Sequence, residues 1–366
     1  MEKLLIVIAF AVVSLTSARA DDAACPSSGK FPRVGTYQVL RGDFHMHTVN
    51  SDGKLTTRER VEESHRMGYD VIAVTDHGKM RACRLAKALG EPLGLIVIRG
   101  IETGIAGPPP YSNEHINVIG VDGDYKPRNP GRWSEQPGGN TVFYQDELKT
   151  IAQHGGFVIY DHPHVGYREP VKWGVAQGLI QGIEVKNEVV RASWNTVEWN
   201  GIWCYPSAFD FGLEHNLTLF ANTDAHAARL ANPPVTLLFV TERSEKGVMD
   251  ALHAGRTVAW FDGMLWGKPD MVSLLVEAMV PVTWSTNPDG TAQLTLTNRG
   301  PISLKAEAAA PNKTELQLPK GGLASLGCGK SLESVELRWT NVWVNTKETL
   351  VTRLVVPKVK GRQPIN

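Results

Sequence analysis

The chain has 366 residues, with 38 basic and 38 acidic side chains and a formal net charge of zero. Apolar residues make up 42% of it, so we expect a packed core and not a globally disordered chain. The balanced charge argues against a nucleic-acid binder, because affinity for a phosphate backbone needs a basic excess or patch. It does not exclude a small phosphorylated substrate.

The first twenty residues are typical of a secretory signal peptide. Lys3 gives a charged start, Leu4 to Val13 is apolar, and Ala18-Arg19-Ala20 fits a small-x-small cleavage site. The apolar run is too short to span a bilayer as a stable anchor. We therefore expect cleavage near Ala20 and a secreted or periplasmic protein without stable membrane insertion.

Short apolar strands alternate with helices along the next part of the chain. The expected strands are seven: 37–43, 71–74, 95–98, 115–121, 157–160, 183–185 and 217–221. The expected helices include 56–68, 81–89, 142–153 and 206–214, and Thr56 with Glu59 forms a capping box at the start of the first. This alternation predicts parallel βα units, and seven strands instead of eight predict an incomplete or distorted barrel.

After about Trp266 the pattern changes. Runs with alternating apolar residues, 293–297, 334–338 and 351–355, are separated by Gly and Pro. They predict a small antiparallel β-sandwich. The expected organisation is a signal peptide at 1–20, a barrel domain at 21–267 and a sandwich domain at 268–366.

Side chains that bind metals follow the expected strands. His45 and His47 follow the first strand, and Asp224 and His226 follow the last. Residues two apart in an extended chain point the same way, so each pair can face one ion. Asp52 lies just beyond His47, and the strands between carry, at or just after them, His77, Glu102, His115, Asp161-His162, His164 and Glu184. Because active sites of (β/α) barrels lie at the carboxyl ends of strands, this pattern predicts a metal-dependent hydrolase.

Residues 40 to 265 resemble the polymerase-and-histidinol-phosphatase (PHP) family. The resemblance rests on 43–48 with 51–53, 75–77, 100–102 and 222–226. It implies a distorted (β/α)7 PHP-type barrel and three divalent ions per chain, for which mixed His and carboxylate ligands suit Zn, Mn or Fe. The implied ligands are His45, His47, Glu102 and Asp224 for the first ion, Glu102 with His115 and His162 for the second, and Asp52, His77 and His226 for the third.

A narrower resemblance links most of the chain to secreted PHP-type phosphodiesterases of the Sb-PDE group. It rests on 157–163, 182–185, 216–218 with 222–226, and 255–261. The sequence thus predicts an exported phosphoesterase, first of all a phosphodiesterase, that hydrolyses small organic phosphate esters with a metal-bound hydroxide at a trinuclear centre. Nothing in the pattern indicates an oligomeric state.

The expected catalytic residues are Glu102, Asp224 and His162, with His164 or Asp161 as the acid that protonates the leaving group. The expected substrate-binding residues are Arg168, Lys186, Asn187 and Arg229, for which a solvated surface role or a turn role is the alternative.

Other functions stay open at this point. The same centre suits a phosphomonoesterase, or a carboxylic-ester or carbamate hydrolase. A non-enzymatic metal-binding or adhesion protein, with the sandwich as its working part, is a further alternative.

Overall fold

The computed structural model describes residues 30–107, 113–128, 143–163, 166–188, 197–229, 231–309, 313–329 and 332–357. The predicted signal peptide and His164 lie outside these residues. Two compact units divide the chain: Thr36–Met271 form the larger one, and Val272–Asn366 belong to the smaller one.

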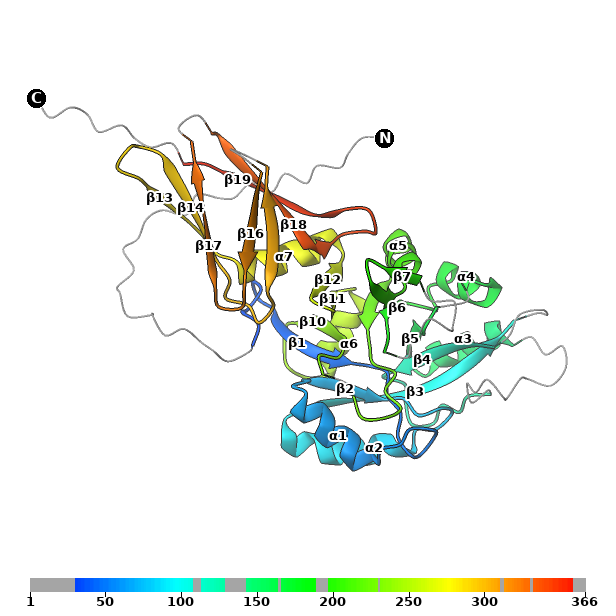
Figure 1. Ribbon diagram of the computed structural model, residues 1–366. Helices are drawn as coiled ribbons and strands as arrows, with labels where there is room; N and C mark the ends of the chain where they lie inside the picture. Colours follow the sequence, from blue (N-terminus) through cyan, green and yellow to red (C-terminus); the bar gives the residue numbers. More distant parts are fainter. Residues whose placement is uncertain are drawn as a thin grey trace, which may run out of the picture. The chain divides into compact units, whose positions relative to one another are not determined.

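The larger unit is a mixed α/β fold around one long sheet (Figure 1). Its strands are β1 (Gln38–Asp43), β2 (Val71–Val74), β3 (Ile96–Ala106), β4 (Asn113–Ile119), β5 (Phe157–Tyr160), β6 (Gly182–Lys186), β9 (Thr218–Ala221), β10 (Val235–Val240), β11 (Thr257–Phe261) and β12 (Met264–Gly267), with a separate hairpin of β7 (Val197–Trp199) and β8 (Ile202–Cys204). Its helices are α1 (Thr57–Arg66), α2 (Arg81–Gly90), the 3-10 turn η1 (Glu91–Leu93), α3 (Tyr144–Gln153), α4 (Glu169–Ala176), α5 (Pro206–Glu214) and α6 (Glu245–His253). Helix α7 (Pro269–Met279) crosses the boundary between the units.

Each of the seven expected strands is present, but the expectation of parallel pairing throughout is wrong. The pairs β1–β2, β2–β3, β5–β6 and β6–β9 are parallel, whereas β4 is antiparallel to both β3 and β5. Strand β3 extends to Ala106 and β4 begins at Asn113, and so short a connection cannot hold the crossover that parallel strands require. The sequence interpretation also missed β10, β11 and β12, which extend the sheet beyond β1 by antiparallel pairing.

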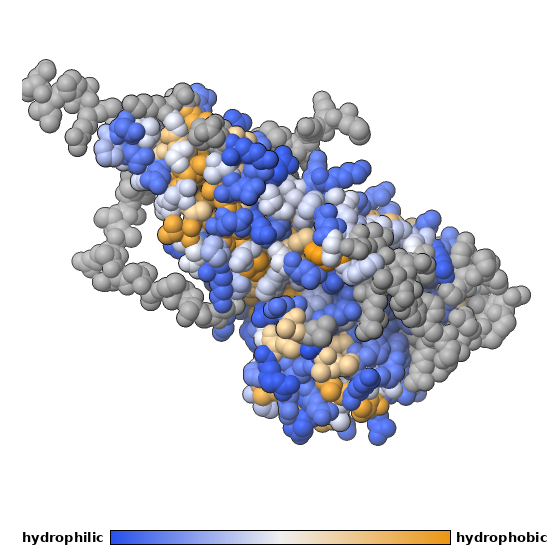
Figure 2. Space-filling view, viewed as in Figure 1, coloured by the Kyte–Doolittle hydropathy of each residue, from blue (hydrophilic) through white to orange (hydrophobic). Residues whose placement is uncertain are grey.

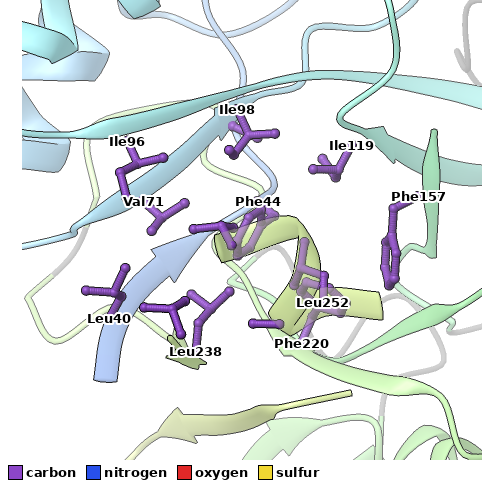
Figure 3. Close-up of a cluster of buried hydrophobic side chains, with 14 of the residues drawn as sticks. Leu40, Phe44, Val71, Ile96, Ile98, Ile119, Phe157, Phe220, Leu238 and Leu252 are labelled. Carbon is purple, nitrogen blue, oxygen red and sulfur yellow. The ribbon is translucent and has the colours of Figure 1, made fainter. Parts of the chain in front are cut away.

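The core of this unit is built from side chains of several strands that meet helix α6. Figure 3 shows Leu40, Phe44, Val71 and Leu238 on one side of Leu252 of α6 and Phe157 on the other, all within one cluster that also contains Phe220. The ring of Phe44 meets that of Phe220 edge-on, with centroids 5.5 Å apart. Burial of these large apolar side chains fixes the strands in register, so the chain segments that follow the strand ends are held in place.

The smaller unit contains two antiparallel sheets, in the orders β13-β14-β17 and β16-β15-β18-β19. The strands are β13 (Val282–Thr286), β14 (Ala292–Thr297), β15 (Leu304–Ala308), β16 (Thr314–Leu318), β17 (Leu323–Cys328), β18 (Ser334–Trp343) and β19 (Thr349–Val355). Buried and less buried residues alternate strictly along β14, as the sequence pattern predicts. Figure 2 shows hydrophobic areas on the visible face of these strands, and Leu323 and Val355 are among the exposed hydrophobic residues.

In the described part of the chain, no helix combines the length and the apolar character that a membrane span requires. The three described cysteines, Cys83, Cys204 and Cys328, are buried and form no disulfide with one another.

Candidate metal centre

Two isolated strand bridges bring the predicted ligands together. Met46 pairs in parallel with Ala225, so the His45–His47 pair lies beside the Asp224–His226 pair. Backbone hydrogen bonds from His47 N to Ala225 O (3.0 Å) and from Asp224 N to His45 O (2.8 Å) hold this arrangement. A second parallel bridge places His77 beside Glu102. Three of the four segments follow the ends of β1, β2 and β9, and the fourth is the middle of β3. No local sequence pattern could have predicted that these segments pair with one another.

Glu102 lies at the centre of the predicted ligands and contacts five imidazoles. Its Oε2 lies 3.1–3.3 Å from ring nitrogens of His45, His47 and His77. Its Oε1 lies 2.8 Å from His115 Nδ1 and 3.4 Å from His162 Nε2. A carboxylate whose two oxygens face different sets of imidazoles is suited to bridge two ions.

The ligand atoms form overlapping groups, within each of which they lie no more than 4.8 Å apart. The groups are His47-Asp52-His77-His226, His45-His47-Asp224, His45-Glu102-His162, His77-Glu102-His115 and His45-Asp161-Glu184. All nine predicted metal ligands occur in the first four. Because the groups share His45, His47, His77 and Glu102, ions bound there would be neighbours.

Several of these ligand atoms are buried without a hydrogen-bond partner, as expected for atoms that bind a cation. His45 Nε2, His77 Nδ1 and Glu102 Oε2 are buried and form no hydrogen bond within the described residues. Buried polar atoms are nearly always paired, so these three unpaired atoms, with Glu102 Oε2 3.3 Å from His45 Nε2 and 3.1 Å from His77 Nδ1, require an explanation. Two atoms that share a tetrahedral ion at about 2.1 Å lie about 3.4 Å apart, so divalent ions fit this donor set.

The electrostatics of the centre follow from packing carboxylates against imidazoles away from water. Burial alone would lower the pKa of His45, but the carboxylates of Asp224, Glu184, Asp161 and Glu102 raise it well above its ordinary value. Burial alone would raise the pKa of Glu102, but His77, His45 and His115 bring it well below the ordinary value. The same balance raises the pKa of His226 to about 9, chiefly through Asp52 and Asp224. Glu102 therefore stays ionised and is available to a cation.

Glu184 orients His45 from the opposite edge of the imidazole. Its Oε1 lies 2.8 Å from His45 Nδ1 and accepts from Asn222 Nδ2 at 3.0 Å. Its Oε2 accepts from the backbone N of His162 (2.8 Å) and from Asn187 Nδ2 (3.3 Å). A carboxylate on the far nitrogen fixes the tautomer and direction of a metal-binding histidine. The sequence interpretation placed Glu184 near the site, either behind the metal ligands or as an inward-facing barrel residue, and the contact with His45 shows the first of these.

Asn187 and Asp161 also lie behind the ligand atoms. Asn187, a predicted substrate contact, is fully buried and donates to Asp224 Oδ2 at 3.1 Å, so it positions that carboxylate. Asp161, a predicted proton donor, is buried at the Nδ1 edge of His45, accepts from Asn117, and has its pKa raised well above the ordinary value by burial. The ligand carboxylates Glu102 and Asp224 face the other edge of His45.

The loop that carries Asp52 closes tightly around the end of β1. Asp76, which follows β2, accepts from the backbone N and the hydroxyl of Thr48 (both 2.7 Å) and from Ser51 (2.8 Å). A Cβ on Gly53 would lie 2.5 Å from the backbone carbon of His47, so only glycine fits there. The loop sets Asp52 Oδ2 3.3 Å from His77 Nε2 and 3.4 Å from His226 Nε2.

The three predicted phosphate-binding cations have other partners. Arg229 is buried and pairs with Asp43 Oδ2 (2.8 Å) and Glu63 Oε2 (3.0 Å), so a substrate-binding role for it is wrong. Lys186 donates to Trp203 O at 2.7 Å and lies 3.4 Å from Asp262. Arg168 is partly exposed and lies 3.2 Å from Glu114 Oε1. The sequence could not show these partners, because each of them lies at least 17 residues away in the chain.

Sequence reasoning missed a second buried arginine beneath the centre. Arg60 is fully buried on α1, although its helix neighbours Arg58 and Glu62 are exposed. It donates to the backbone oxygens of His47 (3.1 Å), Ala225 (2.8 Å) and Ala227 (3.0 Å) and pairs with Glu63 at 2.6 Å. A charged residue at a core-facing helix position was the only sequence signal for it.

Comparison with known proteins agrees with this geometry. The PHP domain family matches residues 43–228, about half of the chain, and the chain belongs to that family. A crystal structure of a two-domain protein from Bacteroides vulgatus, described as containing a predicted PHP-like metal-dependent phosphoesterase, superposes with a TM-score of 0.74. It covers 89% of this chain and 98% of the other at 24% identity, and so shows the same fold.

Matches to characterised relatives are shorter. A phosphoribosyl 1,2-cyclic phosphate 1,2-diphosphodiesterase of Eggerthella lenta is 32% identical over 80 residues, 22% of this chain and 30% of that protein. A 5'-3' exoribonuclease of Haemophilus influenzae is 27% identical over 82 residues, 22% of this chain and 28% of that protein. Each match thus spans under a third of the relative's own length.

Proposed function

We propose that the protein is a metal-dependent phosphoesterase, and that diesters of small organic molecules are its preferred substrates. The observation that carries this proposal is the bridging position of Glu102, whose two oxygens face separate sets of imidazoles. The ligand groups suit up to three ions: one with His45, His47, Glu102 and Asp224, one with Glu102, His115 and His162, and one with Asp52, His77 and His226. Both relatives named above act, by their names, on phosphodiesters, which favours diesters over monoesters.

Divalent ions bound there would supply two kinds of chemistry: they lower the pKa of a bound water toward neutrality and neutralise charge on phosphoryl oxygens. The protein's own residues do the rest. Glu184 fixes the orientation of the His45 ring, and Asn187 fixes that of the Asp224 carboxylate. These ligands therefore need no rearrangement during the reaction. His162 and Asp224 have positive φ angles, 25° and 50°, which are unusual for residues other than glycine and are typical of functional sites.

The test uses purified protein loaded with Zn, Mn or Fe and measured for metal content. We expect hydrolysis of bis-p-nitrophenyl phosphate to exceed that of p-nitrophenyl phosphate, with little on p-nitrophenyl acetate. His162→Ala should abolish turnover. His65→Ala, which changes a histidine of helix α1, is the matched control and should keep it. Activity on the acetate alone would favour the carboxylic-ester hydrolase, and no activity on any ester of a fully loaded protein would contradict the proposal.

Export is a separate proposal and rests on the signal-like sequence at 1–20. Expression of the whole chain, followed by N-terminal sequencing of the mature protein, tests it. A protein that keeps Met1 and stays in the cytoplasmic fraction would contradict export without bearing on the metal centre.

A further inference from the structure

Asn113 is the first residue of β4, the strand that carries the predicted ligand His115, and it is only 5% exposed. Residues two apart on a strand point to the same face, so Asn113 and His115 share one face of β4. The register between β3 and β4 pairs His115 with Gly104, and Glu102 lies two residues before Gly104 on β3. Asn113 therefore lies on the face of the sheet that carries Glu102 and His115.

The amide of Asn113 packs over Gly104. A Cβ on Gly104 would lie 2.2 Å from Asn113 Nδ2 and 2.3 Å from its Oδ1, so only glycine leaves room for the amide. His115 leans in the same direction along the sheet, since its Nδ1 lies 2.8 Å from Glu102 Oε1. Gly104 and Glu102 are two residues apart, which is about 6.7 Å along a strand. The amide is thus one residue pair away from the bridging carboxylate.

Asn117 shows on which side of the ligands Asn113 lies. It shares the same face of β4 and donates to Asp161 Oδ1 at 3.0 Å. Asp161 lies 3.9 Å from His45 Nδ1, the edge of the imidazole that faces away from Glu102. Along β4, His115 stands between Asn117 and Asn113. Asn113 is therefore on the side of the ligands opposite to the residues that support them from behind, and a substrate held by the ions extends toward it.

The amide of Asn113 has no partner of its own. Its Nδ2 and its Oδ1 are both buried and form no hydrogen bond within the described residues. Each of the other buried asparagines that the structure describes donates at least one side-chain hydrogen bond: Asn117, Asn187, Asn222, Asn298 and Asn341. Buried polar groups are nearly always paired, so an amide with an unpaired donor and an unpaired acceptor beside a ligand centre points to a bound group.

We propose that Asn113 binds a hydroxyl group on the organic part of the substrate, so that esters of polyhydroxy alcohols are preferred. A hydroxyl can accept from Nδ2 and donate to Oδ1, whereas the oxygens of a phosphate diester only accept. This inference rests on the proposed phosphoesterase function, because the ester must be held at the metal centre for its alcohol to reach Asn113. Asn113 would then determine specificity without taking part in bond breaking.

The test compares glycerol 1-phosphate with propyl phosphate, which lacks both hydroxyls, by calorimetric titration of the metal-loaded protein. We expect the unchanged protein to bind glycerol 1-phosphate about 10- to 100-fold more tightly, because propyl phosphate leaves the amide unpaired. In Asn113→Leu the two affinities should become equal, with unchanged metal content. Its thermal midpoint should be unchanged or higher, since an apolar group of similar shape replaces an unpaired amide. Gly104→Ala should also lose the preference, because its methyl group displaces the amide.

Asn298→Leu is the matched control. It removes a buried amide that donates to the backbone oxygens of Ile302, Leu318 and Pro319, so it should lower the thermal midpoint and keep the preference for glycerol 1-phosphate.

Equal affinity of the unchanged protein for the two phosphates, or a preference that survives in Asn113→Leu, would overturn the role of Asn113 even in an active phosphodiesterase. A preference that Asn113→Leu abolishes, in a protein that hydrolyses no ester, would support the role of Asn113 and contradict the proposed function instead.

Discussion

Replacement of Arg60 tests whether the arginine beneath the centre holds the metal-binding segments together. Its guanidinium donates to three backbone oxygens, those of His47, Ala225 and Ala227, and pairs with Glu63. Arg60→Met keeps most of the side-chain volume but leaves these oxygens without their donor and Glu63 with Arg229 as its remaining partner. Removing one member of a buried ion pair costs about 3–5 kcal/mol, so we expect a loss of this size.

For a unit of this length, 1 kcal/mol corresponds to about 2–4 °C in the unfolding midpoint. We therefore expect Arg60→Met to lower the midpoint by about 10 °C in calorimetry, and to weaken metal binding because the two ligand pairs separate more easily. Arg58→Met is the matched control, since Arg58 lies on the same helix, is 66% exposed and, among the described residues, pairs with Glu62. An exposed pair of this kind contributes about 0.3–0.5 kcal/mol. Equal midpoints for the two variants would refute the reasoning.

Three further changes test the centre and its surroundings. Glu184→Gln should weaken metal binding about 10- to 100-fold, because the partner that orients His45 is weakened; competition with a chelator measures this. Gly53→Ala should reduce bound metal, because its Cβ would clash with the backbone at His47 and displace Asp52; elemental analysis measures this. Glu188→Gln should remove a pH dependence of stability: burial raises the pKa of Glu188 to about 7 in the folded protein, from an ordinary value of 4.5. Its stabilising effect is therefore full below about pH 4.5 and is lost as the pH rises through 7, so the variant should gain midpoint relative to the unchanged protein above pH 7.

The first two of these changes have matched control variants. Glu62→Gln changes an exposed glutamate of α1 and should leave metal affinity unchanged. Gly327→Ala places a methyl group where no atom lies within 4 Å and should leave metal content unchanged. Identical midpoints of the unchanged protein and Glu188→Gln from pH 4.5 to 8 would show that Glu188 ionises normally.

Local features of the fold could be predicted where neighbours in the sequence decide the outcome. Thr56 and Glu59 form the expected capping box, with both reciprocal hydrogen bonds present, and helix α5 spans the expected Pro206–Glu214. Alternation along β14 and β18 likewise predicted strands of an antiparallel unit. These depend on propensity, capping and side-chain period, all of which act over a few residues.

Pairing between distant segments could not be predicted in the same way. The antiparallel direction of β4 depends on how far β3 extends, and the attachment of β10 to β1 joins segments about two hundred residues apart. The roles of Arg229 and Asn187 likewise depend on partners that are distant in the chain. Both are polar residues near the predicted ligands, but Arg229 pairs with Asp43 and Asn187 donates to Asp224.

The sequence by itself determined which side chains can bind cations and that they follow strand ends, because the chemistry of imidazole and carboxylate belongs to the residue. Only the tertiary structure decided that Glu102 stands among five histidines and that Glu184 and Arg60 support them from behind. Those relations arise from the packing of segments far apart in the chain, where burial and charge balance depend on every neighbour at once.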